Sequence, residues 1–193
     1  MSSTLHFSAP GRAEICGNHT DHQHGCVLAA AVDLETCAEV TPRDDGIVRV
    51  RSEGYAPIEI QLRNLDARED ERGTSAALVR GVAAGIVARG YALRGFEADV
   101  CSSVLPGSGL SSSAAYEVLV GRIFNALSCQ GLISAVEIAQ ISQYAENVYF
   151  GKPSGLMDQM ASSVGGLVYI DFTDVENPIA EKVDFDFANC GYT

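Results

Sequence analysis

The spacing of hydrophobic residues changes near residue 74, and this change limits the folds open to the chain. Before it, apolar and β-branched runs predict strands over 27–32, 35–42, 48–52 and 58–62. After it, helical spacing predicts helices over 75–90, after residue 111, from 134 onward and near 156–163. Strands return over 97–104, 167–171 and 180–185. This order favours an α+β fold, a mixed sheet packed with helices, over a parallel α/β sheet that needs regular alternation.

Two details of this prediction concern the helical half of the chain. Ser134 and Glu137 have the spacing of a capping box, and the helix that they open is predicted to turn Ile138, Ile141, Ala145 and Val148 inward. The charged run over 64–73 is predicted to be a solvated loop.

Residues 105–117 read Leu-Pro-Gly-Ser-Gly-Leu-Ser-Ser-Ser-Ala-Ala-Tyr-Glu. Pro106 ends the preceding strand, Gly107 and Gly109 permit tight turns, and the serines open an apolar run typical of a helix. Free N–H groups and the positive dipole end of a helix favour an anion, most often phosphate. The stretch lacks the Lys-Ser/Thr ending of a Walker A motif, and the alternative is a plain turn with a helix cap.

The composition narrows the class of partner. The 193 residues carry 25 acidic and 13 basic side chains, a net charge of −12, which disfavours non-specific binding to nucleic acid or to an anionic membrane. No apolar run reaches membrane-spanning length, and the first residues lack the pattern of a signal peptide. The six cysteines form no Cys-x-x-Cys pair and are predicted to be reduced, mostly buried thiols. We therefore expect a cytoplasmic protein that acts on small molecules.

Residues 10–25 concentrate an arginine, an aspartate and three histidines in one short stretch. Three interpretations remain open. His19, Asp21, His22 and His24 have side chains that suit zinc, as in a metal-dependent hydrolase. The stretch is otherwise a polar turn before a strand. The interpretation that fits best is a set of neutral and acidic side chains that hydrogen-bond the hydroxyl groups of a sugar.

Two acidic residues stand out in the second half of the chain. Glu146 lies near a predicted helix end, and Asp158 lies in the first turn of the next helix. Taken alone, Glu146 would be a solvated surface acid, and Asp158 would compensate the dipole of its helix. Because they follow the two earlier motifs in a particular order and spacing, a functional interpretation is also open.

The three segments together resemble the GHMP kinases, and the resemblance covers essentially the whole chain. Residues 105–115 are similar to the phosphate-binding second motif of that family. Residues 10–25 and 155–159 are similar to motifs of its galactokinase branch. The resemblance implies the N-terminal domain of a GHMP kinase, with the ribosomal protein S5 domain 2-like fold, over residues 1–193. It also implies ATP and Mg²⁺ as cofactors.

The resemblance assigns a role to each matching residue. Asp158 would lie beside the anomeric hydroxyl of the sugar as base or orienting group, and Arg12 would keep it ionised and stabilise the transferred phosphoryl group. Asn18, His19, Asp21 and Asp158 would bind the sugar. Ser113, or alternatively Ser112, would bind Mg²⁺ together with Glu146. The ATP phosphates would lie on the loop, namely Pro106, Gly107, Ser108, Gly109, Leu110, Ser111 and Ser112.

The implied activity is an ATP-dependent sugar 1-kinase that makes galactose 1-phosphate. Asn18 stands where galactokinases usually carry glutamate, so a kinase for another galactose-like sugar such as galacturonate is the alternative. A non-catalytic sugar sensor is a second alternative, although a pure sensor has no need for Arg12, Glu146 and Asp158 together. The glycine-rich third motif and the C-terminal lobe of the family are absent from these 193 residues, so we expect the isolated chain to be inactive or impaired.

Overall fold

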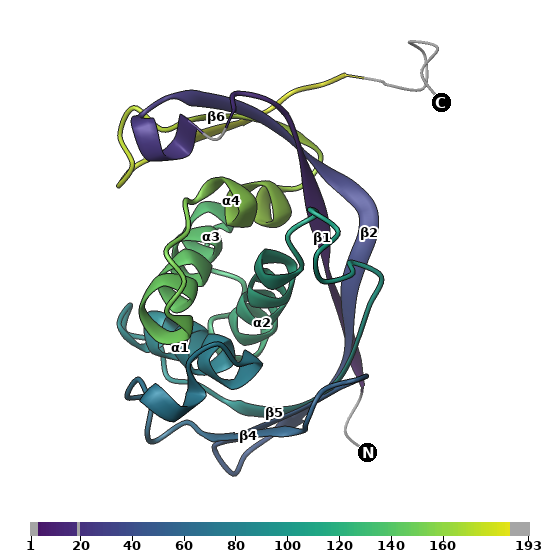
Figure 1. Cartoon of the computed structure of the whole chain (residues 1–193). Helices are drawn as coiled ribbons and strands as arrows, with labels where there is room; N and C mark the ends of the chain where they lie inside the picture. Colours follow the sequence, from purple (N-terminus) through teal and green to yellow (C-terminus); the bar gives the residue numbers. More distant parts are fainter. Residues whose placement is uncertain (1–3, 19, 186–193) are drawn as a thin grey trace.

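A computed structural model describes residues 4–18 and 20–185. Its strands are β1 (Leu5–Cys16), β2 (Cys26–Arg43), β3 (Ile47–Ser52), β4 (Ile58–Gln61), β5 (Gly95–Ser102), β6 (Leu167–Asp171) and β7 (Ile179–Lys182). They form one mixed sheet in the order β4-β3-β5-β2-β6-β7, with β1 paired to β2, and only the β3–β5 pair is parallel. Figure 1 shows this sheet curving around the helices, which gather on its inner face. The predicted α+β class with a mixed sheet is confirmed.

The helices are α1 (Ser75–Val87), α2 (Ser112–Ser128), α3 (Ala135–Tyr144) and α4 (Met157–Val164). Short 3₁₀ turns lie at Thr20–Gln23 and Glu69–Glu71, and a π-helical segment, Ala145–Phe150, directly continues α3. The capping box of Ser134 and Glu137 is present as predicted, with both of its reciprocal hydrogen bonds. None of the helices in the described ranges is long and apolar enough to cross a membrane.

Strand β2 organises the sheet. It pairs with β1 along one side and, on the other, with β6 through residues 26–30 and with β5 through residues 36–43. The sequence predicted two strands, over 27–32 and 35–42, because Asp33 and Leu34 interrupt the alternation. The structure has one continuous strand here. Asp33 and Leu34 are exposed, and the backbone pairing with β1 is present on both sides of them.

Strand β1 was not among the predicted strands, because its polar residues suggested a loop. Its pairing with β2 shifts register between Pro10 and Arg12. Gly11 lies at this bulge, where an added Cβ would come within 2.9 Å of the carbonyl oxygen of Leu110. The close approach lets the backbone N–H of Arg12 donate to that oxygen at 3.0 Å. A bulge of this kind re-aims side chains, and here it directs Arg12 toward the helices.

Two hydrophobic clusters hold the helices on the sheet. The larger one packs α1 and α2 on the half of the sheet formed by β3, β4 and β5, with Phe96 and Phe124 edge to face at 5.1 Å between ring centroids. The smaller one packs α4 on β2 and β6 around Met160 and Ile170. Arg122 of α2 fastens α4 further by donating to the carbonyl oxygens of Ser162 and Ser163. Together these contacts fix α2 and α4 relative to each other and to the sheet.

The charged run over 64–73 is mostly exposed, as predicted, with Leu65 and Glu71 half-buried; Glu71 pairs with Arg80, which is 2% exposed on α1. Two other sequence-based expectations are corrected by the structure. Val148 is exposed and Tyr149 is buried instead, since the wider π turn displaces residues from α-helical spacing. Of the five described cysteines only Cys129 is buried, because most of the others lie on outward positions of strands.

Candidate active site

The centre of the candidate site is an ion pair between β1 and α4. Arg12 Nε donates to Oδ1 of Asp158 at 2.7 Å, and its Nη2 donates to Oδ2 at 2.8 Å. Arg12 Nη1 reaches the carbonyl oxygen of Gly109 in the loop at 2.7 Å. The guanidinium therefore ties the first strand, the loop and the α4 helix together. A two-bond fork of this kind fixes the plane of the carboxylate as well as its position.

The loop before α2 adopts the turns that its glycines predict. Gly107 and Gly109 have φ angles of 78° and 79°, and Ser111 at the start of α2 has a φ of 58°. A serine in this left-handed region is strained, and such strain concentrates at functional sites. The Ser111 side chain makes no cap to α2 and instead donates to Oδ2 of Asp158. The loop predicted to bind phosphate is thereby joined to the candidate catalytic carboxylate.

A second group of polar residues lies at the N-terminus of α2. Ser113 Oγ donates to Oε1 of Glu146 at 3.1 Å, and Lys152 Nζ contacts the same oxygen at 3.1 Å. Glu146 is 2% exposed, so it is not the solvated surface acid of the alternative interpretation. Ser113, not Ser112, makes the contact with Glu146, although both serines line the adjoining cavity. The two residues predicted to share a metal ion therefore lie side by side.

Sequence reasoning missed a buried network beneath these two groups. Gln159 Nε2 donates to Oε2 of Glu146 at 2.8 Å and to Oε2 of Glu117 at 3.2 Å. Burial and then the nearby charge of Glu146 raise the pKa of Glu117 well above its ordinary value, while the Gln159 hydrogen bond acts in the opposite direction. The network connects α4, just after Asp158, to the carboxylate beside Ser113. The sequence feature that could have revealed this network is Glu117, an acidic residue on the otherwise apolar, buried face of α2.

The segment predicted to bind sugar lies beside the start of α4. Asp21 is buried, and its Oδ2 accepts the backbone N–H of Met157 at 3.2 Å. Gly155 permits this approach, because an added Cβ there would lie 1.8 Å from the same oxygen. Asn18 is exposed in the turn after β1 with a φ of 53°, and His19 lies outside the described residues. The structure thus brings Asp21 to the helix of Asp158 and leaves Asn18 open to solvent.

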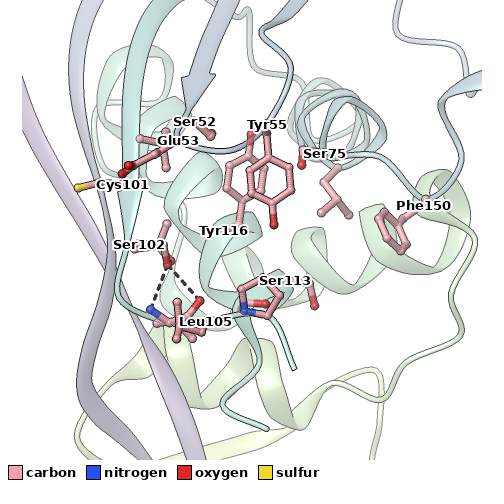
Figure 2. Close-up of a pocket in the computed structure, with 17 residues that line it drawn as sticks. Ser52, Glu53, Tyr55, Ser75, Cys101, Ser102, Leu105, Ser113, Tyr116 and Phe150 are labelled. Atoms are coloured by element: carbon pink, nitrogen blue, oxygen red, sulfur yellow. Dashed lines mark hydrogen bonds between the residues drawn. The ribbon is translucent and has the colours of Figure 1, made fainter. Parts of the chain in front are cut away.

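A cavity of about 490 Å³ opens beside the loop (Figure 2). Its wall includes Pro106 and Ser113 at one end and the aromatic rings of Tyr55, Tyr116 and Phe150 at the other. The hydroxyl of Tyr116 is buried and finds no hydrogen-bond partner among the described residues, and burial raises its pKa. A pocket with aromatic walls, one unpaired polar group and a phosphate-type loop at its edge is suited to a nucleotide.

The zinc interpretation gains no support from the geometry. Over residues 4–18 and 20–185, no three His, Cys, Asp or Glu side chains gather closely enough to hold a metal ion. Asp21 is occupied with the α4 backbone, and His22 and His24 are exposed.

Comparisons with known proteins agree with this arrangement. Residues 75–166 match the family described as GHMP kinases N terminal domain, and residues 2–42 match the galactokinase galactose-binding signature. The chain is 36% identical to a galactokinase of Streptomyces coelicolor over 94% of its own length and 47% of that protein. It is 41% identical to a galactokinase of Chloroflexus aurantiacus over 81% of its length and 40% of that protein. It therefore spans about half the length of the curated relatives that it matches.

Solved structures give the same result. A crystal structure of Lactococcus lactis galactokinase complexed with galactose superposes with a TM-score of 0.84 at 28% identity, over 95% of this chain and 48% of that one. Methanococcus jannaschii mevalonate kinase shares the fold at a TM-score of 0.75 and 16% identity, over 97% of this chain and 58% of that one. The chain thus carries a GHMP kinase N-terminal domain over residues 75–166 and the galactokinase galactose-binding signature over residues 2–42.

Proposed function

We propose that this chain forms the sugar-binding and phosphate-binding half of a kinase that converts galactose to galactose 1-phosphate with ATP. The observation that carries the proposal is the Arg12–Asp158 pair, which lies against both the loop and the sugar-binding signature. The galactokinase relatives, at 36% and 41% identity, support the choice of galactose.

The chemistry needs positioning and charge stabilisation more than covalent catalysis. Asp158 would accept a hydrogen bond from the anomeric hydroxyl and orient its oxygen in line with the γ-phosphate. A bond would then form between that oxygen and the γ-phosphorus of ATP. The bond between the γ-phosphorus and the bridging oxygen would break, and ADP would leave with that oxygen. The hydroxyl proton would pass to Asp158 or to solvent. Arg12 and the N-terminus of α2 would take up the charge on the transferred group. Asn18, His19 and Asp21 would hold the remaining sugar hydroxyls.

The fit of Mg²⁺ to this chain can be judged from Ser113 and Glu146. Their side-chain oxygens lie 3.1 Å apart at a helix N-terminus, and Mg²⁺ prefers hard oxygen ligands together with substrate phosphates. We therefore assign Ser113 and Glu146 as the residues that would hold the ion, with Ser112 as the alternative hydroxyl. Bound Mg²⁺ would neutralise charge on the phosphate oxygens.

The cavity beside the loop supports ATP as the phosphoryl donor. The base and ribose would occupy its aromatic end, near Tyr55 and Tyr116, and the phosphates would extend along residues 106–112. Because the curated relatives are about twice as long, we further propose that a second lobe of the same polypeptide completes the site.

The test measures ADP release with Mg·ATP against galactose, galacturonate, arabinose and glucose. The full parent polypeptide and this 193-residue chain are assayed side by side. We expect galactose-dependent turnover by the parent and little or none by the chain alone. A folded parent that releases no ADP with any sugar would refute the kinase and favour a sugar sensor.

One observation favours a second candidate substrate. Asn18 is neutral, exposed and able to donate a hydrogen bond, so it is compatible with a carboxylate at the outer end of the sugar. A turnover preference for galacturonate over galactose would assign the enzyme to that substrate. Asn18→Glu would then be expected to reverse the preference, because a second carboxylate would repel the first.

A further inference from the structure

Two cysteines face each other across the sheet, on the side away from the helices. In the antiparallel register of β2 and β5, Cys37 is directly opposite Cys101. Their strand neighbours Thr36, Ala38 and Val100 are buried, so both cysteines occupy outward positions. Directly opposed residues in such a pair have Cα atoms about 4.5–5.5 Å apart, within the range of about 4.4–6.8 Å that a disulfide spans. This Cα spacing is compatible with a bond between the two sulfur atoms.

The surroundings of the pair leave it open to reagents. Cys37 and Cys101 line the same shallow groove of about 320 Å³, together with His6, Glu39 and Asp99. Both thiols are free, and Cys101 is exposed while Cys37 is half-buried. Within the described register no other cysteine is opposite a second one, since Cys16 pairs with Leu28 and Cys26 with Asp171.

We propose that Cys37 and Cys101 are a dithiol modification site that closes into a cross-strand disulfide on exposure to a small-molecule disulfide. Burial, Glu35 and Cys101 itself raise the pKa of Cys37, so the exposed Cys101 reacts first. Its thiolate attacks one sulfur of the reagent, forms a mixed disulfide and releases one thiol. Cys37 Sγ then attacks Cys101 Sγ and releases the second thiol. The two cysteines lose two electrons and two protons, and the reagent becomes two thiols.

A Cys37–Cys101 disulfide would lie beside the cavity next to the loop but would not occupy it. Cys101 also borders the large cavity, but Figure 2 shows its sulfur directed away from the aromatic rings. The next residue, Ser102, accepts the backbone N–H of Val104 and contacts Thr36 on β2. A disulfide would therefore fasten the end of β5 to β2 just where the chain leaves the sheet for the loop.

The test uses the reduced 193-residue chain and oxidised glutathione. Remaining thiols are alkylated in denaturant, and peptides are mapped by mass spectrometry without reduction. We expect a linked Cys37–Cys101 peptide pair that dithiothreitol separates. Cys37→Ser should stop at a glutathione adduct on Cys101, with a lifetime at least about tenfold longer than in the wild type.

The matched control is Cys26→Ser, which removes another exposed thiol and should leave the Cys37–Cys101 bond unchanged. A stable adduct on Cys101 in the wild type, or a bond from either residue to a different cysteine, would overturn the proposal. The readout involves no sugar and no ATP, so its outcome is independent of the proposed kinase activity.

Discussion

Replacing Glu117 by glutamine is expected to stabilise the protein, by a margin that increases with pH. The Glu117 carboxyl group is fully buried, and burial followed by the charge of Glu146 raises its pKa well above the ordinary value of 4.5. In the unfolded chain this carboxyl ionises near its ordinary pKa, whereas the folded protein keeps it protonated to a higher pH. The stability associated with Glu117 is therefore complete below the unfolded pKa and is lost as pH rises toward the folded pKa.

The size of the effect follows from proton linkage. Each pH unit between the unfolded and folded pKa values removes about 1.4 kcal/mol from the wild type, and the glutamine variant has no such proton. The amide preserves the oxygen that accepts from Gln159 Nε2 at 3.2 Å. It also offers an N–H to Gln159 Oε1, which has no hydrogen-bond partner in the part of the chain that the structure describes. Below the unfolded pKa the two proteins should thus be nearly equal in stability.

The assay is urea unfolding of Glu117→Gln and wild type at several pH values from about 4 to 8, with the free energy of unfolding obtained by linear extrapolation. Glu137→Gln is the control of opposite sign. Hydrogen bonds from the Ser134 side chain and backbone lower the pKa of Glu137, so its stability contribution is present above the unfolded pKa and is lost as pH falls. If the curves of Glu117→Gln and wild type run parallel across the whole range, Glu117 is ionised in the folded state and the reasoning is wrong.

Three further predictions address the site and the fold. Asp158→Asn should lower turnover of the parent enzyme by about two to four orders of magnitude while circular dichroism stays unchanged; wild-type turnover in a folded variant would remove Asp158 from the mechanism. Gly155→Ala should destabilise the chain by about 1–3 kcal/mol in urea, because the added Cβ meets a carboxylate oxygen of Asp21. This loss should largely disappear in an Asp21→Ala background, and its persistence there would contradict the steric explanation. Arg80→Met should lower the free energy of unfolding by about 3 kcal/mol in the same assay, since it leaves Glu71 without its buried partner. A decrease of less than about 1 kcal/mol would contradict a stabilising role for this ion pair.

The sequence predicted those parts of the fold that follow from local periodicity. The four helices and the capping box of Ser134 were predicted because apolar spacing and side-chain caps act within a few residues. Strand β1 was not, because its polar side chains disguise a strand that is defined by its pairing with the next strand, β2, and not by its own residue pattern. The exposed Val148 was mispredicted because nothing local in the sequence marks the change from an α-helical to a π-helical turn.

The residues of the candidate site were predictable where each lies within a recognisable sequence motif. Family resemblance placed Arg12 and Asp158 in one site, and the structure joins them by two hydrogen bonds across 146 positions of sequence. The hydrogen bond from Ser111 to Asp158 and the hydrogen bonds of Gln159 were not predicted. The first depends on a left-handed backbone turn that aims a serine at Asp158, and the second on the burial of two carboxylates around one amide. Neither the backbone conformation at Ser111 nor the packing around Gln159 can be read from residue spacing within a helix.

The geometry of the site depends on two places where the backbone comes unusually close to another segment. At Gly11 an added Cβ would meet the carbonyl of Leu110 at 2.9 Å, and at Gly155 it would meet Asp21 at 1.8 Å. The first contact holds β1 against the loop, immediately before Arg12, and the second holds the sugar-binding signature against the start of α4, three residues before Asp158. A side chain at Gly11 would push β1 away from the loop, and a side chain at Gly155 would push Asp21 away from the start of α4. The alignment of the Arg12–Asp158 pair with the loop is therefore determined by the absence of two side chains as much as by the charges themselves.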